Sequence, residues 1–175
     1  MSKMYVIKGS IVDLDVDIIV NAANKTLLGG GGVDGIIHRR AGKELLEECK
    51  TLGGCETGEA KITDGYNLYA RKIIHTVGPV YSSGTRGEST LLDNCYINSM
   101  KLAEEYRVKT NKEEVTIAFP CISTGVYHFP KDKACDIAVN TINKINNKNI
   151  KVIFVCFEDE DYKLYLDKVH GIKLL

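Results

Sequence analysis

Two asparagines, four glycines and an aspartate between residues 20 and 35 could bind a phosphorylated sugar and orient a water molecule. Asn21 and Asn24 follow an apolar run, Gly29–Gly32 come next, and Asp34 lies at the start of a helical pattern. Glycines let backbone N–H groups approach a bulky anion, and a helix N-terminus adds partial positive charge there. A carboxylate suits a water that attacks an ester. A plain capping loop needs one glycine, so the spacing predicts a ligand site, in which Asp34 can also cap the helix.

A second loop with a glycine follows another apolar run. Residues 120–130 read Pro-Cys-Ile-Ser-Thr-Gly-Val-Tyr-His-Phe-Pro and come directly after the run 115–119. In open α/β sheets, ligands bind outside the carboxyl ends of the strands, and both loops leave such ends. The two loops could therefore close on one diphosphate. Phe157 ends a third apolar run, where an aromatic ring can stack on a base.

Two common phosphate-binding motifs fit the first loop poorly. The string Gly30-x-Gly32-x-x-Gly35 matches the dinucleotide fingerprint, but in that motif the glycines follow the strand at once, whereas residues 22–29 intervene here. The acid expected at the end of the next strand is missing, because Asp64 leads directly into a turn. No Gly-Lys-Ser/Thr follows the glycines, as a P-loop requires. The loop therefore indicates another class of phosphate site.

Composition limits the classes of protein that the sequence allows. The 175 residues, 44% of them hydrophobic, suit one compact domain over residues 1–175 with a sizeable core. The 23 basic and 23 acidic residues balance, which argues against general binding to nucleic acid or to an anionic membrane. No apolar stretch could span a bilayer, and residues 1–4 show no signal-peptide pattern. We expect a cytoplasmic protein that acts as a monomer.

The six cysteines are scattered and form no C-x-x-C pair. Small disulfide-stapled folds are short and poor in core, unlike this chain, so reduced thiols are expected. Cys49 and Cys55 have no histidine nearby at ligand spacing, so no zinc site is expected. The cysteines are Cys49, Cys55, Cys95, Cys121, Cys135 and Cys156.

Strand and helix patterns alternate along the chain and position these loops. The order predicts an α/β fold, a three-layer α/β/α sandwich around a mixed central sheet. The first strand pattern alternates in the manner of an edge strand. The expected strands are residues 4–8, 16–20, 61–63, 72–77, 115–119 and 152–157, and the expected helices are residues 33–50, 89–108, 132–146 and 159–170.

Five segments, spread along the chain in a characteristic order, carry a family resemblance. They are residues 16–24 (Val-Asp-Ile-Ile-Val-Asn-Ala-Ala-Asn), 29–34 (four glycines, Val, Asp), 57–63 (Thr-Gly-Glu-Ala-Lys-Ile-Thr), 74–79 (Ile-His-Thr-Val-Gly-Pro) and 123–127 (Ser-Thr-Gly-Val-Tyr). Together they resemble macrodomains of the MacroD type. The resemblance implies the macrodomain fold and a pocket for ADP-ribose that needs neither metal nor cofactor.

The resemblance implies a role for each matched part of the pocket. The glycine loop and Tyr127 would contact the distal ribose, the loop 123–126 would wrap the diphosphate with backbone N–H groups, and Phe157 would stack on adenine. The implied ADP-ribose contacts are Ser10, Ile11, Ala22, Asn24, Gly31, Gly32, Val33, Ser123, Thr124, Gly125, Val126, Tyr127 and Phe157.

Asn24, Asp34 and His38 are the implied catalytic residues. Asn24 would bind the distal ribose, and Asp34 would position or activate the attacking water. His38 lies one helical turn after Asp34 on the same face. It could orient Asp34 or contact phosphate, and a purely structural role fits equally well. Asn21 is expected to tie the loop backbone together, and His75 is expected to be a hydrogen-bonded core residue.

Two positions depart from the family pattern. Ser10 stands where these domains usually have the aspartate that accepts the adenine amino group, so the acceptor here is shorter and uncharged. His128 stands where a glycine is common in the second loop. We expect these changes to affect ligand binding more than the chemistry, because Asn24 and Asp34 are present.

The function that the resemblance implies is a metal-independent hydrolase. It would remove mono-ADP-ribose from the acidic side chains of proteins by water attack on the ribosyl ester, with ADP-ribose and mono-ADP-ribosylated proteins as its partners. One alternative is an ADP-ribose-binding module without turnover, which the presence of Asn24 and Asp34 argues against. The other is a deacetylase of O-acetyl-ADP-ribose, which would use the same pocket.

Overall fold

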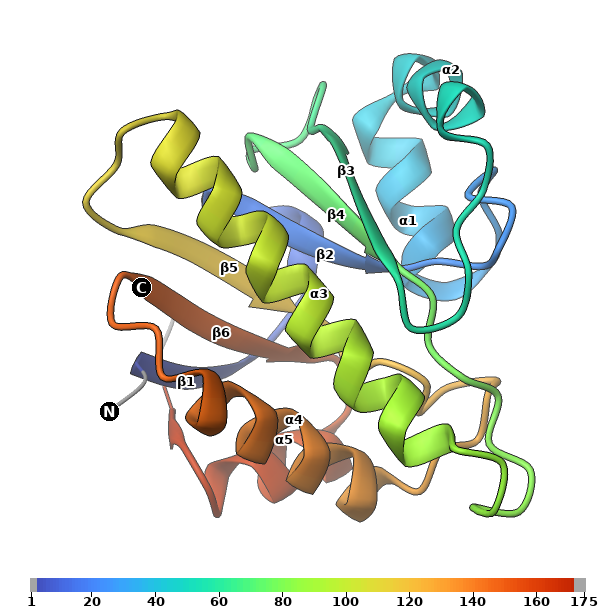
Figure 1. Cartoon of the computed structure of the whole chain (residues 1–175), viewed down its shortest axis with the longest axis vertical. Helices are drawn as coiled ribbons and strands as arrows, with labels where there is room; N and C mark the ends of the chain where they lie inside the picture. Colours follow the sequence, from blue (N-terminus) through green and yellow to red (C-terminus); the bar gives the residue numbers. More distant parts are fainter. Residues whose placement is uncertain (1–2, 172–175) are drawn as a thin grey trace.

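A seven-stranded sheet forms the middle layer of the protein (Figure 1), a computed structural model in which residues 3–171 are described. The strand order is β3-β4-β2-β5-β6-β1-β7, and within residues 3–171 only the β3–β4 pair is antiparallel, so the prediction of a mixed sheet is confirmed. The strands are β1 (Lys3–Lys8), β2 (Ile18–Ala22), β3 (Ala60–Asp64), β4 (Lys72–Thr76), β5 (Val115–Phe119), β6 (Ile150–Cys156) and β7 (His170–Gly171).

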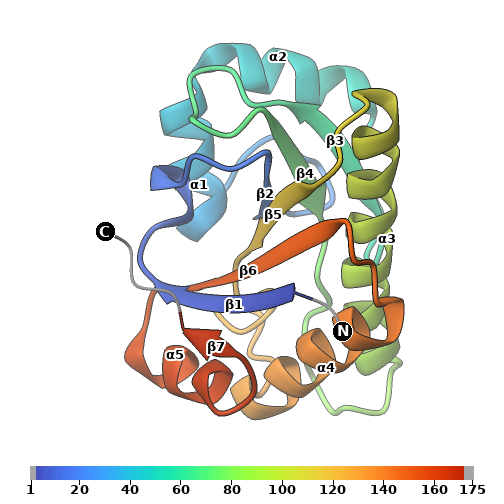
Figure 2. The same cartoon turned by 90° about the vertical axis from the view of Figure 1, so that its left-hand side faces the viewer.

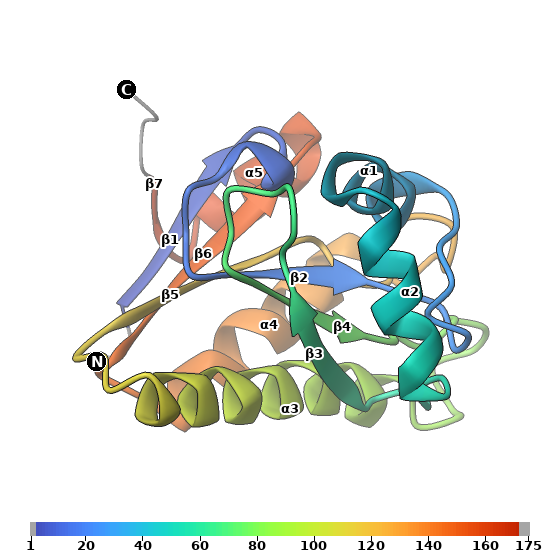
Figure 3. The same ribbon diagram turned by 90° about the horizontal axis from the view of Figure 1, so that it is seen from above.

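Helices cover both faces of the sheet and complete the three expected layers. Figure 2 shows α1 and α3 on opposite sides of the sheet, and Figure 3 shows α3 running along one face. The short 3₁₀ helix η1 (Ile11–Asp13), α1 (Gly32–Ala41) and α2 (Lys43–Leu52) pack on one face, and α3 (Glu88–Lys109), α4 (Lys131–Ile145) and α5 (Asp159–Leu166) pack on the other. None of the helices between residues 3 and 171 is long and apolar enough to cross a membrane.

Side chains alternate between two cores, one on each face of the sheet. In β2, Ile18 and Val20 pack toward α3 and α4, whereas Ile19 packs toward α1 and α2. In β5, Phe119 likewise packs into the core beneath α3 and α4, and Ala118 packs into the core beneath α1 and α2. A parallel strand between two helical layers is apolar on both faces, which is why the runs 16–20 and 115–119 read as continuous hydrophobic segments.

The helix predicted over residues 33–50 is wrong in one respect, because the chain forms two helices there. Gly42 separates α1 from α2 with a φ of 98°, in the region that a residue with a side chain rarely adopts. The apolar spacing continues across this break, so periodicity alone did not predict it.

Two further expectations at the same side of the sheet need correction. The helix predicted over 159–170 ends at Leu166, and His170, which is exposed, begins β7. β7 pairs with β1, so the strand expected at an edge has neighbours on both sides. The domain expected over 1–175 extends beyond the described part of the chain at residues 1–2 and 172–175.

Candidate active site at the carboxyl edge of the sheet

Four neighbouring parallel strands, in the order β2-β5-β6-β1, end at the same edge of the sheet. The carboxyl ends of these strands and the segments that follow them hold every predicted site residue outside α1. Ser10 follows β1, Asn24 follows β2, the loop 120–130 follows β5, and Phe157 follows β6. The N–H group of Gly9 donates to the carbonyl of Cys156 at 3.0 Å and ties two of these strand ends together. The sheet topology therefore brings the predicted residues to one edge.

The side chain of Asn24 is held by its own loop. Its Oδ1 accepts hydrogen bonds from the backbone N–H of Thr26 at 3.2 Å and from the Thr26 hydroxyl at 2.7 Å. Its Nδ2 donates to the carbonyl of Gly29 at 3.0 Å. One of the two N–H bonds on Nδ2 therefore remains available, in a side chain whose orientation is already fixed.

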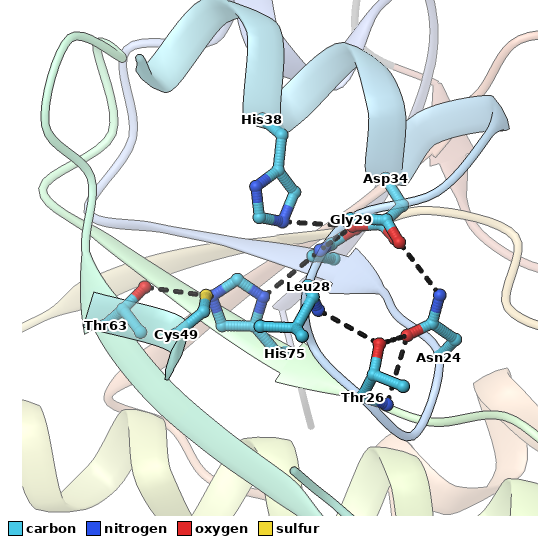
Figure 4. Close-up of polar contacts among 10 residues, drawn as sticks. Asn24, Thr26, Leu28, Gly29, Asp34, His38, Cys49, Thr63 and His75 are labelled. Atoms are coloured by element: carbon cyan, nitrogen blue, oxygen red, sulfur yellow. Dashed lines mark hydrogen bonds and ion pairs between the residues drawn. The ribbon is translucent and has the colours of Figure 1, made fainter. Parts of the chain in front are cut away.

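The side chains of Asn24 and Asp34 both approach the position that a Cβ of Gly30 would occupy, and Figure 4 shows the two side chains near Gly29. A Cβ atom built on Gly30 would lie 3.1 Å from Oδ2 of Asp34 and 3.3 Å from Nδ2 of Asn24. The loop after β2 supplies the amide and the first turn of α1 supplies the carboxylate. Only a glycine at this position leaves both groups undisturbed.

Asp34 is 5% exposed, and its two carboxylate oxygens have different surroundings. Oδ1 accepts a hydrogen bond from Nδ2 of Asn21 at 2.8 Å and lies 3.4 Å from Nε2 of His38. Oδ2 faces Gly30 and the amide of Asn24. One oxygen is thus anchored inside the protein, while the other points toward the loop where a ligand would enter.

His38 packs beside this carboxylate. Its ring lies 3.8 Å from where a Cβ of Gly29 would be. Its buried Nε2 is 3.4 Å from Oδ1 of Asp34, a contact that lacks hydrogen-bond geometry, and it has no other partner among residues 3–171. A buried polar atom without a partner carries a free-energy cost unless a water or ligand satisfies it. His38 is therefore placed both to contact Asp34 and to meet a group bound in the site.

The N-terminus of α1 offers backbone donors next to the two side chains. The N–H groups of Gly32, Val33 and Asp34 make no hydrogen bond within the described part of the chain, because the first bond of the helix runs from Gly35 to Gly31. Such donors, with the helix dipole behind them, favour anions.

The second loop shows a comparable set of donors. Between residues 3 and 171, the backbone N–H groups of Ser123, Thr124, Gly125 and Val126 have no hydrogen-bond partner. The loop is nevertheless fixed, since Phe129 donates to the carbonyl of Ser123 at 2.9 Å. It also packs closely, because a Cβ on Gly78 would lie 2.1 Å from the Ser123 hydroxyl.

The remaining residues of the second loop are more open. Val126 is 85% exposed, and Tyr127 is partly buried, with its carbonyl accepting from the N–H of Tyr81 at 2.8 Å. His128 has a φ of 59°, a conformation that glycine adopts more easily. The loop thus keeps at this position the backbone shape that the expected glycine would favour.

The ends of β1 and β6 form the far side of the site. Phe157 is 80% exposed, which leaves its ring free to stack on a planar ligand. Ser10 precedes η1 without a side-chain capping bond, and Ile11 is buried in the core, so its backbone and not its side chain is available to a ligand.

Asn21 and His75 both contact the site, although neither was expected there from the sequence. Asn21 was expected to bind the loop backbone, but its Nδ2 donates to Asp34 and lies 3.1 Å from Nδ1 of His75. Nε2 of His75 lies 2.9 Å from the hydroxyl of Thr63. The prediction that His75 is a hydrogen-bonded core residue is confirmed. The signal in the sequence was a polar side chain within each of three neighbouring strands, β2, β4 and β3.

Cys49 lies close enough to His75 to resemble a cysteine–histidine pair, with 4.0 Å between Sγ and Nε2. Burial raises the pKa of the Cys49 thiol to about 11, and burial, followed by the charge of His38, lowers the pKa of His75 to about 3. A neutral thiol beside a neutral imidazole is not an activated nucleophile. All six cysteines are free, as expected. No group of three potential ligands that could hold a metal occurs between residues 3 and 171.

Comparison with known proteins identifies the family. A family model described as "Macro domain" matches residues 20–138, the segment that contains Asn24, Asp34, His38 and the second loop. The chain belongs to the macro domain family. The resemblance drawn from the sequence is therefore confirmed, together with the fold that it implied.

Named relatives of this macro domain include enzymes. A macro domain-containing protein of Methanosarcina mazei is 54% identical, over 93% of this chain and 86% of that protein. "O-acetyl-ADP-ribose deacetylase" of Escherichia fergusonii is 48% identical, over 94% of this chain and 93% of that protein. "ADP-ribose glycohydrolase MACROD2" of Xenopus laevis is 49% identical over 96% of this chain, which spans 40% of that longer protein.

Solved structures agree with the fold. The Oceanobacillus iheyensis macrodomain with MES bound has a TM-score of 0.84 and 42% identity, covering 93% of this chain and 88% of that one. The Trypanosoma brucei macrodomain in complex with ADP-ribose has a TM-score of 0.82 and 41% identity. The match covers 94% of this chain and 68% of that one.

The neutral His75 gives a testable dependence of stability on pH. Because its pKa is about 3 in the folded protein and 6.5 in the unfolded chain, the unfolded chain binds the extra proton below pH 6.5. This residue should therefore lower the free energy of unfolding by about 1.4 kcal/mol per pH unit between roughly pH 6 and pH 4. Urea unfolding of the parent and of His75→Asn should show their difference changing with that slope. Parallel pH curves would show that His75 titrates normally.

Proposed function

We propose that this macro domain, spanning residues 1–175, hydrolyses the ester between ADP-ribose and the acidic side chains of proteins. The observation that carries the proposal is the approach of the Asn24 amide and the free oxygen of Asp34 to one point above Gly30. The unpaired backbone donors of the glycine loop and of the second loop flank that point. The names of the relatives in Xenopus laevis and Escherichia fergusonii support a hydrolase that acts on ADP-ribose derivatives.

The proposed chemistry uses the two oxygens of Asp34 differently. Oδ2 would accept a hydrogen bond from a water and orient it, or remove its proton, while Oδ1 stays bonded to Asn21. The remaining N–H of Asn24 would donate to a hydroxyl of the distal ribose, whose anomeric carbon carries the ester. His38, with its unpaired Nε2, would contact Asp34 or the bound ligand. The reaction proposed here needs no metal and no cofactor.

The proposed binding mode follows the four strand ends. The donors of Gly31, Gly32 and Val33 and the ring of Tyr127 would surround the distal ribose, beside Ala22. The N–H groups of residues 123–126 would bind the diphosphate. Phe157 would stack on adenine, with Ser10 and Ile11 at its edge. The ADP-ribose in the Trypanosoma brucei macrodomain structure supports this class of ligand.

Removal of the acetyl group from O-acetyl-ADP-ribose is a second candidate, which the name of the Escherichia fergusonii relative favours. Both reactions cleave an ester on the distal ribose, so the same water and the same carboxylate could serve both. The two differ in what leaves the pocket, a protein side chain or acetate. Parallel assays with a glutamate-modified protein and with O-acetyl-ADP-ribose would rank them.

Asp34→Ala should fold and lose most of the hydrolysis, because loss of a positioned acid–base group typically costs a factor of roughly 100 or more. The release of ADP-ribose from a glutamate-modified protein would measure this. Glu47→Ala, which removes an exposed carboxylate from α2, is the control and should keep the parent rate. A folded Asp34→Ala protein with the parent rate would contradict the assignment.

Gly31→Glu should abolish ADP-ribose binding, because the carboxylate would enter the proposed ribose site and repel the diphosphate. Gly31 is a cleaner position than Gly32, whose φ of 57° would strain any side chain. Gly31 has no atom within 4 Å of its built Cβ, so the variant should fold. Calorimetry with ADP-ribose tests this, and parent affinity would place the ligand elsewhere.

Ser10→Asp should increase the preference for ADP-ribose over IDP-ribose, which lacks the adenine amino group. A hydrogen bond to a charged acceptor contributes about 1.5–3 kcal/mol, against about 0.5–1.5 kcal/mol for a neutral pair. Dissociation constants of both ligands for both proteins give the comparison. If the parent already discriminates strongly and the substitution adds nothing, another group contacts the base.

A further inference from the structure

Three buried polar side chains form a row across the sheet that ends at Asp34. Asn21 of β2 and His75 of β4 are direct partners in the parallel register. Thr63 of β3 pairs with Ile73, so it lies diagonally from His75 on the neighbouring strand, and its hydroxyl is 2.9 Å from Nε2 of His75. All three are at most 2% exposed. They face the side of the sheet that packs against α1 and α2, because their chain neighbours Val20 and Ile74 face the other core.

The hydrogen-bond donors and acceptors of this row match when the proton of the His75 ring is on Nε2. When the Thr63 hydroxyl donates to the carbonyl of Asp64 at 3.2 Å, its oxygen can accept Nε2–H of His75 across the 2.9 Å that separates them. With its proton on Nε2, the ring presents Nδ1 as an acceptor. The two N–H bonds of Asn21 then go to Nδ1 of His75 and to Oδ1 of Asp34.

The other histidine tautomer would break this pattern. A proton on Nδ1 would face the donor Nδ2 of Asn21, and the amide could relieve the conflict only by rotating its oxygen toward His75 and thus also toward the carboxylate of Asp34. The carbonyl oxygen of Asn21 is buried without a partner among residues 3–171. The two N–H contacts therefore decide the orientation of this amide.

Burial keeps the His75 ring neutral. The loss of hydration and the neighbouring His38 hold its pKa near 3, so the ring carries one proton throughout the neutral range. Neutral imidazole has one donor and one acceptor, which the row requires. The ring centroids of His38 and His75 are 6.5 Å apart, and no hydrogen bond joins the two rings. Within residues 3–171, the row is therefore the hydrogen-bonded connection between His75 and Asp34.

The geometry points to His75 as a positioning residue that, through the Asn21 amide and with Thr63 selecting its tautomer, fixes the reactive orientation of the Asp34 carboxylate. Figure 4 shows His75 and Thr63 together with Asp34. His75 and Thr63 are at most 2% exposed, so neither would touch a substrate in the proposed pocket. Holding Oδ1 in place leaves Oδ2 directed toward the water. The inference rests on the proposed function for its kinetic consequence.

Thr63→Val and Thr63→Ser form a matched pair for the test. Valine has nearly the shape of threonine but cannot accept a hydrogen bond, whereas serine keeps the hydroxyl. We expect Thr63→Val to lower kcat for ADP-ribose release about tenfold or more, with the KM and the ADP-ribose dissociation constant unchanged, since misplacement of a catalytic group slows the chemical step. Thr63→Ser should keep kcat within about twofold of the parent.

Nitrogen NMR of the histidine rings tests the same inference without kinetics. His75 can be recognised as the ring that does not titrate above pH 5. In the parent its Nε2 should be protonated and its Nδ1 bare, and in Thr63→Val the signals should shift toward the other tautomer. A parent ring protonated on Nδ1 would overturn the inference, even if Thr63→Val failed to fold.

The outcomes separate this inference from the proposed function. If the parent releases no ADP-ribose, the proposed function fails and the tautomer measurement still decides the role of His75. If the parent is active and folded Thr63→Val matches Thr63→Ser in kcat, the row only stabilises the core and the inference is wrong. A fall in thermal stability of Thr63→Val without a fall in kcat would lead to the same conclusion.

Discussion

The close contact between helix α1 and the glycine loop is the constraint on which the site depends. A Cβ atom on Gly35 would lie 2.6 Å from the carbonyl oxygen of Gly30, which no side chain could tolerate without moving the backbone. Because Gly35 has no Cβ atom, the first turn of α1 packs directly on the loop after β2. That contact brings Asp34 over Gly30, next to Asn24, and directs the free N–H groups of the helix toward the same space.

Placing a carboxylate there has a free-energy cost, because a nearly buried charge loses its hydration. The protein offsets part of the cost with the Asn21 hydrogen bond and the proximity of His38. The rest of the cost is not offset on the side that faces Gly30, because Oδ2 accepts no hydrogen bond within residues 3–171. Full compensation would need more hydrogen-bond donors to Oδ2, but those donors would occupy the position of the attacking water in the proposed reaction. Asp34 thus has fewer hydrogen bonds on its Oδ2 side than on its Oδ1 side, and the Oδ2 side is where the proposed chemistry takes place.

The order and type of the elements could be predicted from the sequence because strands buried on both faces are mainly apolar, as in residues 115–119. The break at Gly42 could not, since the hydrophobic spacing continues through it and only the backbone conformation reveals two helices. The same limit applies to the site. Asn24, Asp34 and His38 lie in a local motif and could be read directly. Asn21, His75 and Thr63 come from three strands, and their contact depends on a register that one sequence does not display.

Four separate strands supply the four parts of the pocket, and this separation has an evolutionary consequence. Ser10 at the end of β1 is connected to Asp34 through the sheet and not through a shared loop. A change in the residues that meet the base therefore leaves the reactive end in place, and the reverse holds too. In the proposed binding mode, a substitution at Ser10 would change the group that meets the base while the reaction stays the same. Substrate range and catalytic chemistry could then change separately.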